Sequence, residues 1–248
     1  MSHWNDSVWP RLPPDWCGAP VGQVHCVRVF LDRLPAEAPA SLRRFLTEEE
    51  IGRADRFVTT SDRARAVVGR ATLRILLGRA MRCVNFLALH IEVTAHGKPF
   101  LRGGPAFNLS HGGSVILLAF TDSAPVGVDI EPETAGGAWR EVSPRLHPLE
   151  RAELASAADP TATFLKIWTR KEAVAKAVGS GLSMDPSLWA VSAAEPRILI
   201  PPPGVRAATP LTLFGLLPAR SYIGSAAVQG IGDLRCWTFG PECHCPSS

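Results

Sequence analysis

The stretch from Phe164 to Leu182, which reads as a helix with well-defined ends, constrains the fold of this chain more than any other segment. Asp159 can accept the free N–H groups of a first turn, Pro160 suits the first helical position, and Gly179-Ser180-Gly181 stops the helix. At 100° per residue one side of this helix is apolar, which predicts that this side is buried. The apolar side comprises Phe164, Ile167, Trp168, Val174, Ala175 and Val178.

Glu172 and Lys176 lie one turn apart at the edge of this apolar side. Taken alone, they predict an i,i+4 ion pair on a solvated flank, worth a few tenths of a kcal/mol. A role for both side chains in a polar site would require polar or charged residues from other parts of the chain to lie near this helix.

A second stretch, from Val126 to Glu131, reads as a strand with two carboxylates on one face. Side chains alternate along a strand, so Asp129 and Glu131 share a face with the side-chain-free Gly127. Two such carboxylates repel each other unless a cation or basic groups lie between them. They are hard oxygen ligands, of the kind that Mg²⁺ accepts while it keeps waters and binds substrate phosphates. Solvated acids at a strand end are the alternative that this stretch leaves open.

Composition places the chain among globular proteins. Its 248 residues are 46% hydrophobic, enough for one large domain or two small ones. Neither a signal peptide nor a run of about 20 apolar residues is present, so we expect a cytoplasmic protein that does not enter a membrane. The six cysteines predict reduced thiols rather than a disulfide framework, and Cys243-His244-Cys245 lacks a partner pair for a metal.

The distribution of charge is more informative than the net charge of +3, which is too small to indicate nucleic-acid binding. The first half is basic and the second is slightly acidic. The basic side chains between residues 53 and 82 predict either a solvated helix face or a cleft for a polyanionic small molecule. They are Arg53, Arg56, Arg63, Arg65, Arg70, Arg74, Arg79 and Arg82.

The order of elements predicts an α+β fold in which each half has one long helix and several strands. Residues 1–20, rich in Pro and Trp, predict an irregular strap. Helices are expected over 41–57, with a fresh start at Thr47, and from a cap at Asp62 to about Arg82. Residues 132–148 predict a long loop. Strands are expected over 24–31, 89–93, 107–111, 115–120 and 126–131, and an antiparallel set over 189–192, 198–200, 211–216, 222–228 and 235–239.

Four short motifs, in this order, resemble the motif set of the Sfp-type 4′-phosphopantetheinyl transferase family. They are Gly97-Lys98-Pro99, Phe107-Asn108-Leu109-Ser110-His111, Gly127-Val128-Asp129-Ile130-Glu131 and Trp168-Thr169-Arg170-Lys171-Glu172-Ala173-x-x-Lys176. Order and spacing agree over residues 53–192. At Gly112 the chain departs from the family, which often has serine after this histidine.

The resemblance implies a pseudo-twofold monomer of two similar halves, each with a long helix packed on a small antiparallel sheet. Residues 21–125 would bind the phosphates of coenzyme A (CoA), and 126–240 would bind Mg²⁺ and carry the catalytic helix. The implied reaction moves phosphopantetheine from CoA to a serine of an apo acyl or peptidyl carrier protein and releases 3′,5′-ADP. Such enzymes serve fatty acid, polyketide or nonribosomal peptide synthesis.

The resemblance also implies roles for individual residues. Asp129, Glu131 and Glu172 would bind Mg²⁺, Glu172 would take the proton of the attacking serine, and Lys176 would contact the pyrophosphate. The remaining nucleotide contacts would come from Arg53, Arg56, Arg65, Lys98, Ser110 and His111. Lys98 is expected at a loop tip, in the turn His96–Pro99. A non-catalytic carrier-protein docking module and a CoA-binding regulatory module are the alternatives; neither requires the acids and Lys176.

Overall fold

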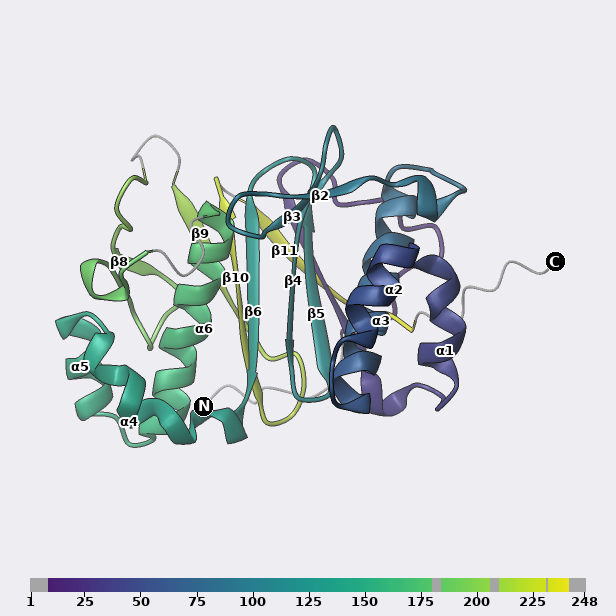
Figure 1. Cartoon of the computed structure of the whole chain (residues 1–248). Coiled ribbons are helices and arrows are strands. Elements are labelled where there is room, and N and C mark those ends of the chain that lie inside the picture. Colours follow the sequence, from purple (N-terminus) through teal and green to yellow (C-terminus); the bar gives the residue numbers. More distant parts are fainter. Residues whose placement is uncertain (1–8, 180–183, 206–209, 231, 241–248) are drawn as a thin grey trace.

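The computed structural model describes residues 9–179, 184–205, 210–230 and 232–240, and Figure 1 shows it as a ribbon. The first half comprises β1 (Gln23–Phe30), α1 (Ala38–Leu42), α2 (Glu48–Asp55), α3 (Thr60–Ala80), β2 (Ile91–Val93), β3 (Pro99–Leu101), β4 (Ala106–Gly112) and β5 (Val115–Thr121). The second half comprises β6 (Val126–Pro132), α4 (Trp139–Val142), α5 (Pro148–Ala155), α6 (Pro160–Val178), β7 (Ala190–Val191), β8 (Ile198–Ile200), β9 (Leu211–Leu216) and β10 (Tyr222–Gln229). A last strand, β11 (Asp233–Thr238), follows.

The two halves repeat one plan. Each begins with a strand, continues through two short helices, a long helix and a two-stranded hairpin, and ends with two strands. The strand order is β1-β5-β4 in one sheet and β6-β10-β9 in the other, so the first strand pairs with the last in both halves. The expected α+β fold of two similar halves is therefore confirmed.

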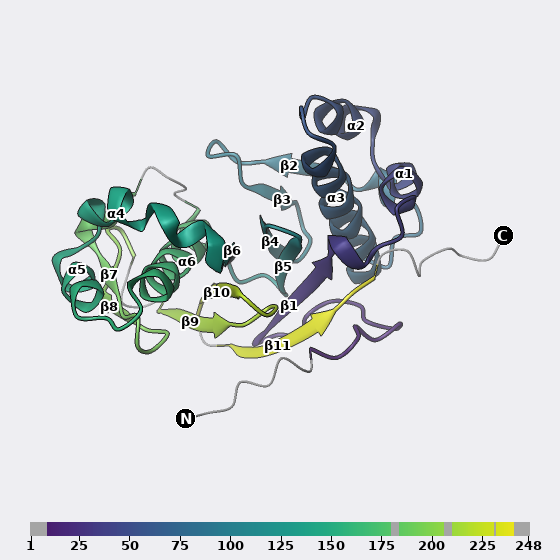
Figure 2. The ribbon, with the colours of Figure 1, turned by 90° about the horizontal axis from the view of Figure 1, so that it is seen from below.

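The sheets lie between two groups of helices, as Figures 1 and 2 show. α3 covers the first sheet and α6 covers the second, and each helix shares an apolar core with the strands of its own half. A third core joins the two sheets, with Cys26 of β1 and Val128 of β6 among its fully buried members. The side-chain oxygen of Asn108 on β4 accepts the Val128 amide at 2.9 Å, which links the sheets directly.

The helix starts follow from their capping residues. Thr47 and Glu50 form a reciprocal capping box at α2, and His147 and Glu150 form the corresponding one at α5. The carboxylate of Asp159 accepts the Ala162 amide at 3.0 Å, as predicted for the start of α6. Gly179 ends α6 in the left-handed conformation, at φ +80°. The predicted stop residues Ser180 and Gly181 lie outside the described residues.

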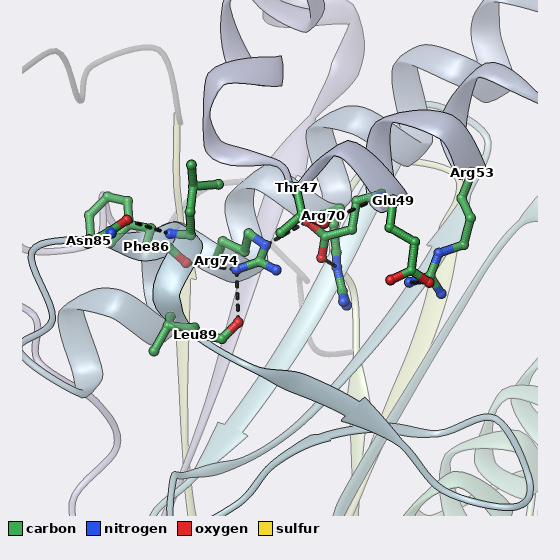
Figure 3. Close-up of polar contacts among 10 residues, drawn as sticks. Thr47, Glu49, Arg53, Arg70, Arg74, Asn85, Phe86 and Leu89 are labelled. Atoms are coloured by element: carbon green, nitrogen blue, oxygen red, sulfur yellow. Dashed lines mark hydrogen bonds and ion pairs between the residues drawn. The ribbon is translucent and has the colours of Figure 1, made fainter.

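Both capping-box glutamates also tie their short helix to the long helix of the same half. The Glu50 carboxylate pairs with Arg70 and, at 2.7 Å, with Arg74 of α3. Arg74 further donates to the carbonyls of Phe86 and Leu89, as Figure 3 shows. In the second half Glu150 is fully buried and lies 2.9 Å from the Lys171 ammonium of α6. Each pairing satisfies a buried charge and fixes the packing of the helices.

The structure corrects two helix predictions. Thr59, not Asp62, caps α3: its hydroxyl accepts the Asp62 amide at 3.0 Å, so the helix begins earlier than expected. The fresh helix start expected at Thr47 is confirmed, since Thr47 caps α2, but the segment before it is helical only to Leu42 and continues as a 3₁₀ segment at Arg43–Phe45.

Two further predictions for the second half are wrong. The loop expected over 132–148 contains α4 and two 3₁₀ segments, Glu133–Ala138 and Ser143–Arg145. The strand expected over 235–239 does not join an antiparallel sheet of this half: β11 lies parallel to β1, at the edge of the first sheet. β7 and β8 form a separate hairpin. The prediction of a boundary at residues 125/126 stays a prediction.

Residues 9–20 run without a helix across the first sheet, where Leu12 and Trp16 are buried. The Leu12 amide donates to the Thr238 carbonyl of β11 at 2.8 Å, and the Trp16 indole donates to His25 of β1 at the same distance. Residues 1–8 and the tail with Cys243-His244-Cys245 lie outside the described residues. Within the described part, no helix is both long and apolar enough to cross a membrane.

Candidate active site

The site is built where α6 crosses β6 at Gly127. A Cβ at this position would overlap the Ala173 carbonyl and the Ala177 amide, and would lie 2.9 Å from the carbonyl carbon of Lys176. The absent side chain therefore lets the helix backbone rest directly on the strand. This close approach faces Glu172 and Lys176 of α6 towards the strand face that carries Asp129.

Asp129 and Lys176 form the centre of the site. The Lys176 ammonium lies 2.6 Å from Asp129 Oδ1 and 3.2 Å from both the Ser110 hydroxyl and the Val128 carbonyl. The Ser110 hydroxyl donates to the same Asp129 oxygen at 2.8 Å. Lys176 thus reaches across to β6 instead of forming the solvated pair with Glu172 that the helix alone predicts. The other oxygen of Asp129, Oδ2, is buried and has no hydrogen-bond partner.

The carboxylates of Glu131 and Glu172 share this environment. Burial, together with the neighbouring charges of Asp129 and Glu172, raises the pKa of Glu131 to about 7. Burial also raises the pKa of Glu172; Lys176 opposes this change and Asp129 adds to it. The three acids therefore repel one another electrostatically, and Lys176 alone does not neutralise them.

This donor set fits a divalent cation by its chemistry. Carboxylate oxygens are the ligands Mg²⁺ prefers, and the orphaned Asp129 Oδ2 is a buried acceptor that a cation would satisfy. Among the residues that the structure describes, no three acidic, histidine or cysteine side chains already lie close enough to hold a metal. Glu131 and Glu172 would have to close around the ion, while the Lys176 ammonium supplies the positive charge beside Asp129.

Basic groups reach the site from the first half. Arg65 of α3 donates to the Gly113 carbonyl at 3.1 Å, next to the end of β4, and pairs with Asp62 at 2.6 Å. Its Nε is buried and has no hydrogen-bond partner. Burial lowers the pKa of His111, and the charges of Arg65 and Lys176 lower it further. Ser110 therefore lies at Asp129, and Arg65 and His111 lie at the end of β4 next to it; contacts of all three with a nucleotide stay predictions.

Arg53 and Arg56 are less directly placed. Both are exposed on or directly after α2, and Arg53 pairs with Glu49 at 3.0 Å on the outer side of that helix (Figure 3). The turn predicted around Gly97 is present, at φ +79°. The Lys98 ammonium, however, is turned inward onto two backbone carbonyls. Phosphate contacts by Arg53, Arg56 and Lys98 stay predictions.

Gly112, where the family often has serine, is explained by its surroundings. A Cβ there would lie 2.8 Å from the Ile130 carbonyl and 3.0 Å from the Pro132 ring. β4 therefore approaches β6 so closely that a side chain would collide with its backbone. The following Gly113, at φ +51°, turns the chain towards Ser114, whose amide donates to the Tyr222 hydroxyl at 3.0 Å.

Several supporting side chains were missed by sequence reasoning. Thr169 of α6 and Ser225 of β10, the strand neighbour of Asp129, share a buried hydrogen bond of 3.0 Å. Arg170 donates to the carbonyls of Ser192 and Glu195, and Lys171 to those of Pro186 and Trp189. These contacts anchor α6 just before Glu172. Buried hydroxyls and backbone carbonyls leave no periodic pattern, so only their membership of the Trp168–Lys176 motif could have indicated Thr169, Arg170 and Lys171, and no signal indicated Ser225.

Comparison with known proteins agrees with the arrangement. Residues 36–123 match the family model described as 4′-phosphopantetheinyl transferase, N-terminal, and residues 125–199 match that of the 4′-phosphopantetheinyl transferase superfamily. The chain is 30% identical to the 4′-phosphopantetheinyl transferase HetI of Nostoc sp. over 227 residues. These aligned residues cover 88% of this chain and 92% of the relative.

Two Bacillus relatives are similar over a shorter range. The 4′-phosphopantetheinyl transferase of Bacillus subtilis is 30% identical over 162 residues, 63% of this chain and 70% of its own. The 4′-phosphopantetheinyl transferase psf-1 of Bacillus pumilus is 32% identical over 165 residues, 62% and 66% of the two chains. The chain therefore belongs to the 4′-phosphopantetheinyl transferase superfamily and is an enzyme that transfers 4′-phosphopantetheine to carrier proteins.

Proposed function

We propose that this enzyme uses CoA and Mg²⁺ to modify a serine of apo acyl or peptidyl carrier proteins, at the site around Asp129. One observation carries the proposal: Asp129 Oδ2, a buried acceptor without a donor, belongs to the carboxylate that pairs with the Lys176 ammonium and shares its surroundings with Glu131 and Glu172. A metal-bound pyrophosphate presents a cation and an anion together, so its cation would satisfy Asp129 Oδ2 and its phosphate oxygens would accept from the Lys176 ammonium.

Asp129, Glu131 and Glu172 would hold the metal ion. Bound Mg²⁺ supplies neutralisation of the charge that develops on the pyrophosphate. The carboxylates gain from the same contact, because a cation would oppose the burial and the neighbouring negative charges that together raise the pKa of Glu131 to about 7. Lys176 would exchange part of its hydrogen bonding at Asp129 and Ser110 for a phosphate oxygen.

Glu172 would act as the general base. The serine oxygen attacks the phosphorus attached to the pantetheine arm, a P–O bond forms, and the bond to the bridging oxygen breaks to release 3′,5′-ADP. The serine proton passes to the Glu172 carboxylate, directly or through a water. A carboxylate whose pKa is raised by burial is better matched to this task than a solvated one.

The first half would hold the nucleotide end of CoA. Arg65 and His111 would contact its phosphates from α3 and β4, a role supported by the contact of Arg65 with Gly113 at the end of β4 and by the hydrogen bond of Ser110 to Asp129. The exposed guanidinium groups of Arg53 and Arg56 would add charge at the entrance, where solvent weakens each contact. The protein is expected to act as a cytoplasmic monomer.

The test is the intact mass of an apo carrier protein incubated with the enzyme and CoA. We expect the mass of one phosphopantetheine group to be added with Mg²⁺ present and not with excess chelator. Asp129→Asn should raise the Mg²⁺ concentration needed for half-maximal rate. Transfer that is unaffected by chelator, or by Asp129→Asn, would contradict the proposed site. Acyl and peptidyl carriers, tested side by side, would show which pathway the enzyme serves.

A further inference from the structure

The hairpin between β2 and β3 reaches from the first half to the end of the catalytic helix. Figures 1 and 2 show this hairpin extending from the first half towards the second, and its Lys98 contacts α6. Its turn is rigid: the Thr94 amide donates to the Lys98 carbonyl at 2.8 Å, the Gly97 amide donates to the Thr94 carbonyl at 2.9 Å, and the Lys98 amide donates to the Thr94 hydroxyl at 3.1 Å. Gly97 takes the left-handed conformation that closes the turn.

The turn directs the Lys98 ammonium into the molecule. It donates to the Val126 carbonyl of β6 at 2.9 Å and to the Lys176 carbonyl of α6 at 2.6 Å. Burial lowers the pKa of Lys98 to about 8. The Lys98 ammonium of the first half therefore links β6, which carries Asp129, to α6, which carries Glu172 and Lys176.

Helix physics explains why this contact is favourable. The last four carbonyls of a helix have no N–H donor inside the helix, and they form the negative end of its dipole. Lys176 lies in the last turn of α6, two residues before the helix ends at Val178. Lys98 thus satisfies a carbonyl that the helix leaves open and brings a positive charge to its negative end.

Lys176 is consequently held at two points. Lys98 binds its backbone carbonyl, and Asp129 binds its side-chain ammonium at 2.6 Å. The same Lys98 group holds Val126, three residues before Asp129 on β6. A shift of α6 along β6 would have to break both Lys98 contacts.

We propose that Lys98 is a positioning residue, which locks α6 onto β6 so that Lys176 and Glu172 face Asp129, and that it does not bind a nucleotide phosphate. This inference rests on the proposed function only in so far as Lys176 and Glu172 act in catalysis. It reassigns a side chain for which the motif resemblance implies a phosphate contact.

A double-mutant cycle in the full chain separates the two roles. Lys98→Met should lower kcat about 10-fold by displacing Lys176, since misplacements of 1 Å can cost up to about 100-fold. The ratio of kcat/KM for CoA to that for dephospho-CoA should stay at the wild-type value. In a Lys176→Met background, Lys98→Met should lower kcat by less than about 2-fold, because the residue through which it acts is already gone.

The matched control is Lys166→Met, the same substitution on the exposed side of α6, which should leave kcat and the substrate ratio unchanged. Multiplicative losses in the double mutant, or a reduced preference for CoA in Lys98→Met, would overturn the proposal in favour of a phosphate contact. Lys98→Arg, which keeps the charge, should recover part of the lost rate.

Labelling of the wild-type protein gives a result independent of activity. Lysines are acetylated and the rate at each position is measured by peptide mass spectrometry. Lys98 should be acetylated slowly and Lys166 quickly, and CoA should not change the rate at Lys98. Protection of Lys98 by CoA would show that the ligand contacts it and would overturn the proposal. An enzyme that fails to modify any carrier would contradict the proposed function, and this labelling result would still decide the role of Lys98.

Discussion

Replacing Gly127 by alanine would place a methyl group where the backbone of α6 rests on β6. The new Cβ would overlap the Ala173 carbonyl and the Ala177 amide, and ordinary contact begins at 3.4 Å, so α6 would have to move by more than about 1 Å. Both atoms belong to the helix backbone, which cannot rotate away as a flexible side chain can. We therefore expect a loss of about 3 kcal/mol in the free energy of unfolding, the upper end of the usual cost of overpacking.

The same displacement separates Glu172 and Lys176 from Asp129. A misplacement of about 1 Å in a catalytic site can lower kcat by about 100-fold. Urea unfolding and carrier modification at saturating Mg²⁺ measure the two effects separately. The matched control is Gly52→Ala in α2, where a Cβ meets nothing within 4 Å. Removal of a helix glycine there should stabilise the protein by up to about 1 kcal/mol. A Gly127→Ala enzyme with wild-type stability and turnover would refute the close packing of α6 on β6.

Three further predictions concern the first half. Burial favours the neutral form of Glu50, but hydrogen bonds from the arginines of α3 outweigh it and lower its pKa from 4.5 to about 2. The free energy of unfolding should therefore fall as the pH drops from about 4.5 to 2. In urea titrations the Glu50→Gln variant should lose about 3 kcal/mol less over this range than the wild-type protein. The variant Glu49→Gln, at an exposed position, should lose as much as the wild-type protein. Arg65→Ala should weaken CoA binding, measured by calorimetry, about 10-fold, whereas Arg53→Ala, at an exposed position, should have a smaller effect. Equal effects of the two substitutions would indicate that the phosphates bind nearer the surface than proposed. The Thr72 hydroxyl is buried without a partner, so Thr72→Val should raise the free energy of unfolding by about 1 kcal/mol, and a destabilised variant would show that the hydroxyl is satisfied.

The parts of the fold that were predictable from sequence depend on short-range physics. The ends of α6 follow from Asp159, Pro160 and Gly179, which act on their own turn of helix. The faces of β6 follow from alternation, which places Asp129 with Gly127 whatever the strand pairs with. At α3, two residues able to cap compete within one turn, and Thr59 takes the role expected for Asp62.

The parts that were not predictable depend on contacts between distant segments. β11 pairs with β1 although more than 200 residues separate Gln23 from Asp233, and no local pattern specifies that partner. The parallel pairing places the last strand of the chain on the sheet of the first half. The inward orientation of the Lys98 side chain was likewise not predictable, because its acceptors are backbone carbonyls that leave no pattern in the sequence.

The candidate site shows the same division. Asp129, Glu172 and Lys176 were found because their side chains lie in recognisable motifs. Their neighbours were not, since Thr169 and Ser225 meet only after α6 has packed on the second sheet. Arg53 and Arg65 look alike as charges in the sequence, and only burial separates the exposed Arg53 from Arg65, whose Nε is enclosed.

The most direct test of the account is the Mg²⁺ dependence of carrier modification by Glu172→Gln compared with Asp129→Asn. Glutamine keeps the size of the side chain but removes its basicity, so kcat should fall by about 10²–10⁴ and excess Mg²⁺ should not restore it. Asp129→Asn weakens a metal ligand without removing the base, and its rate should recover at high Mg²⁺. A Glu172→Gln enzyme with near-normal turnover at ordinary Mg²⁺ would contradict the role of α6 in the reaction.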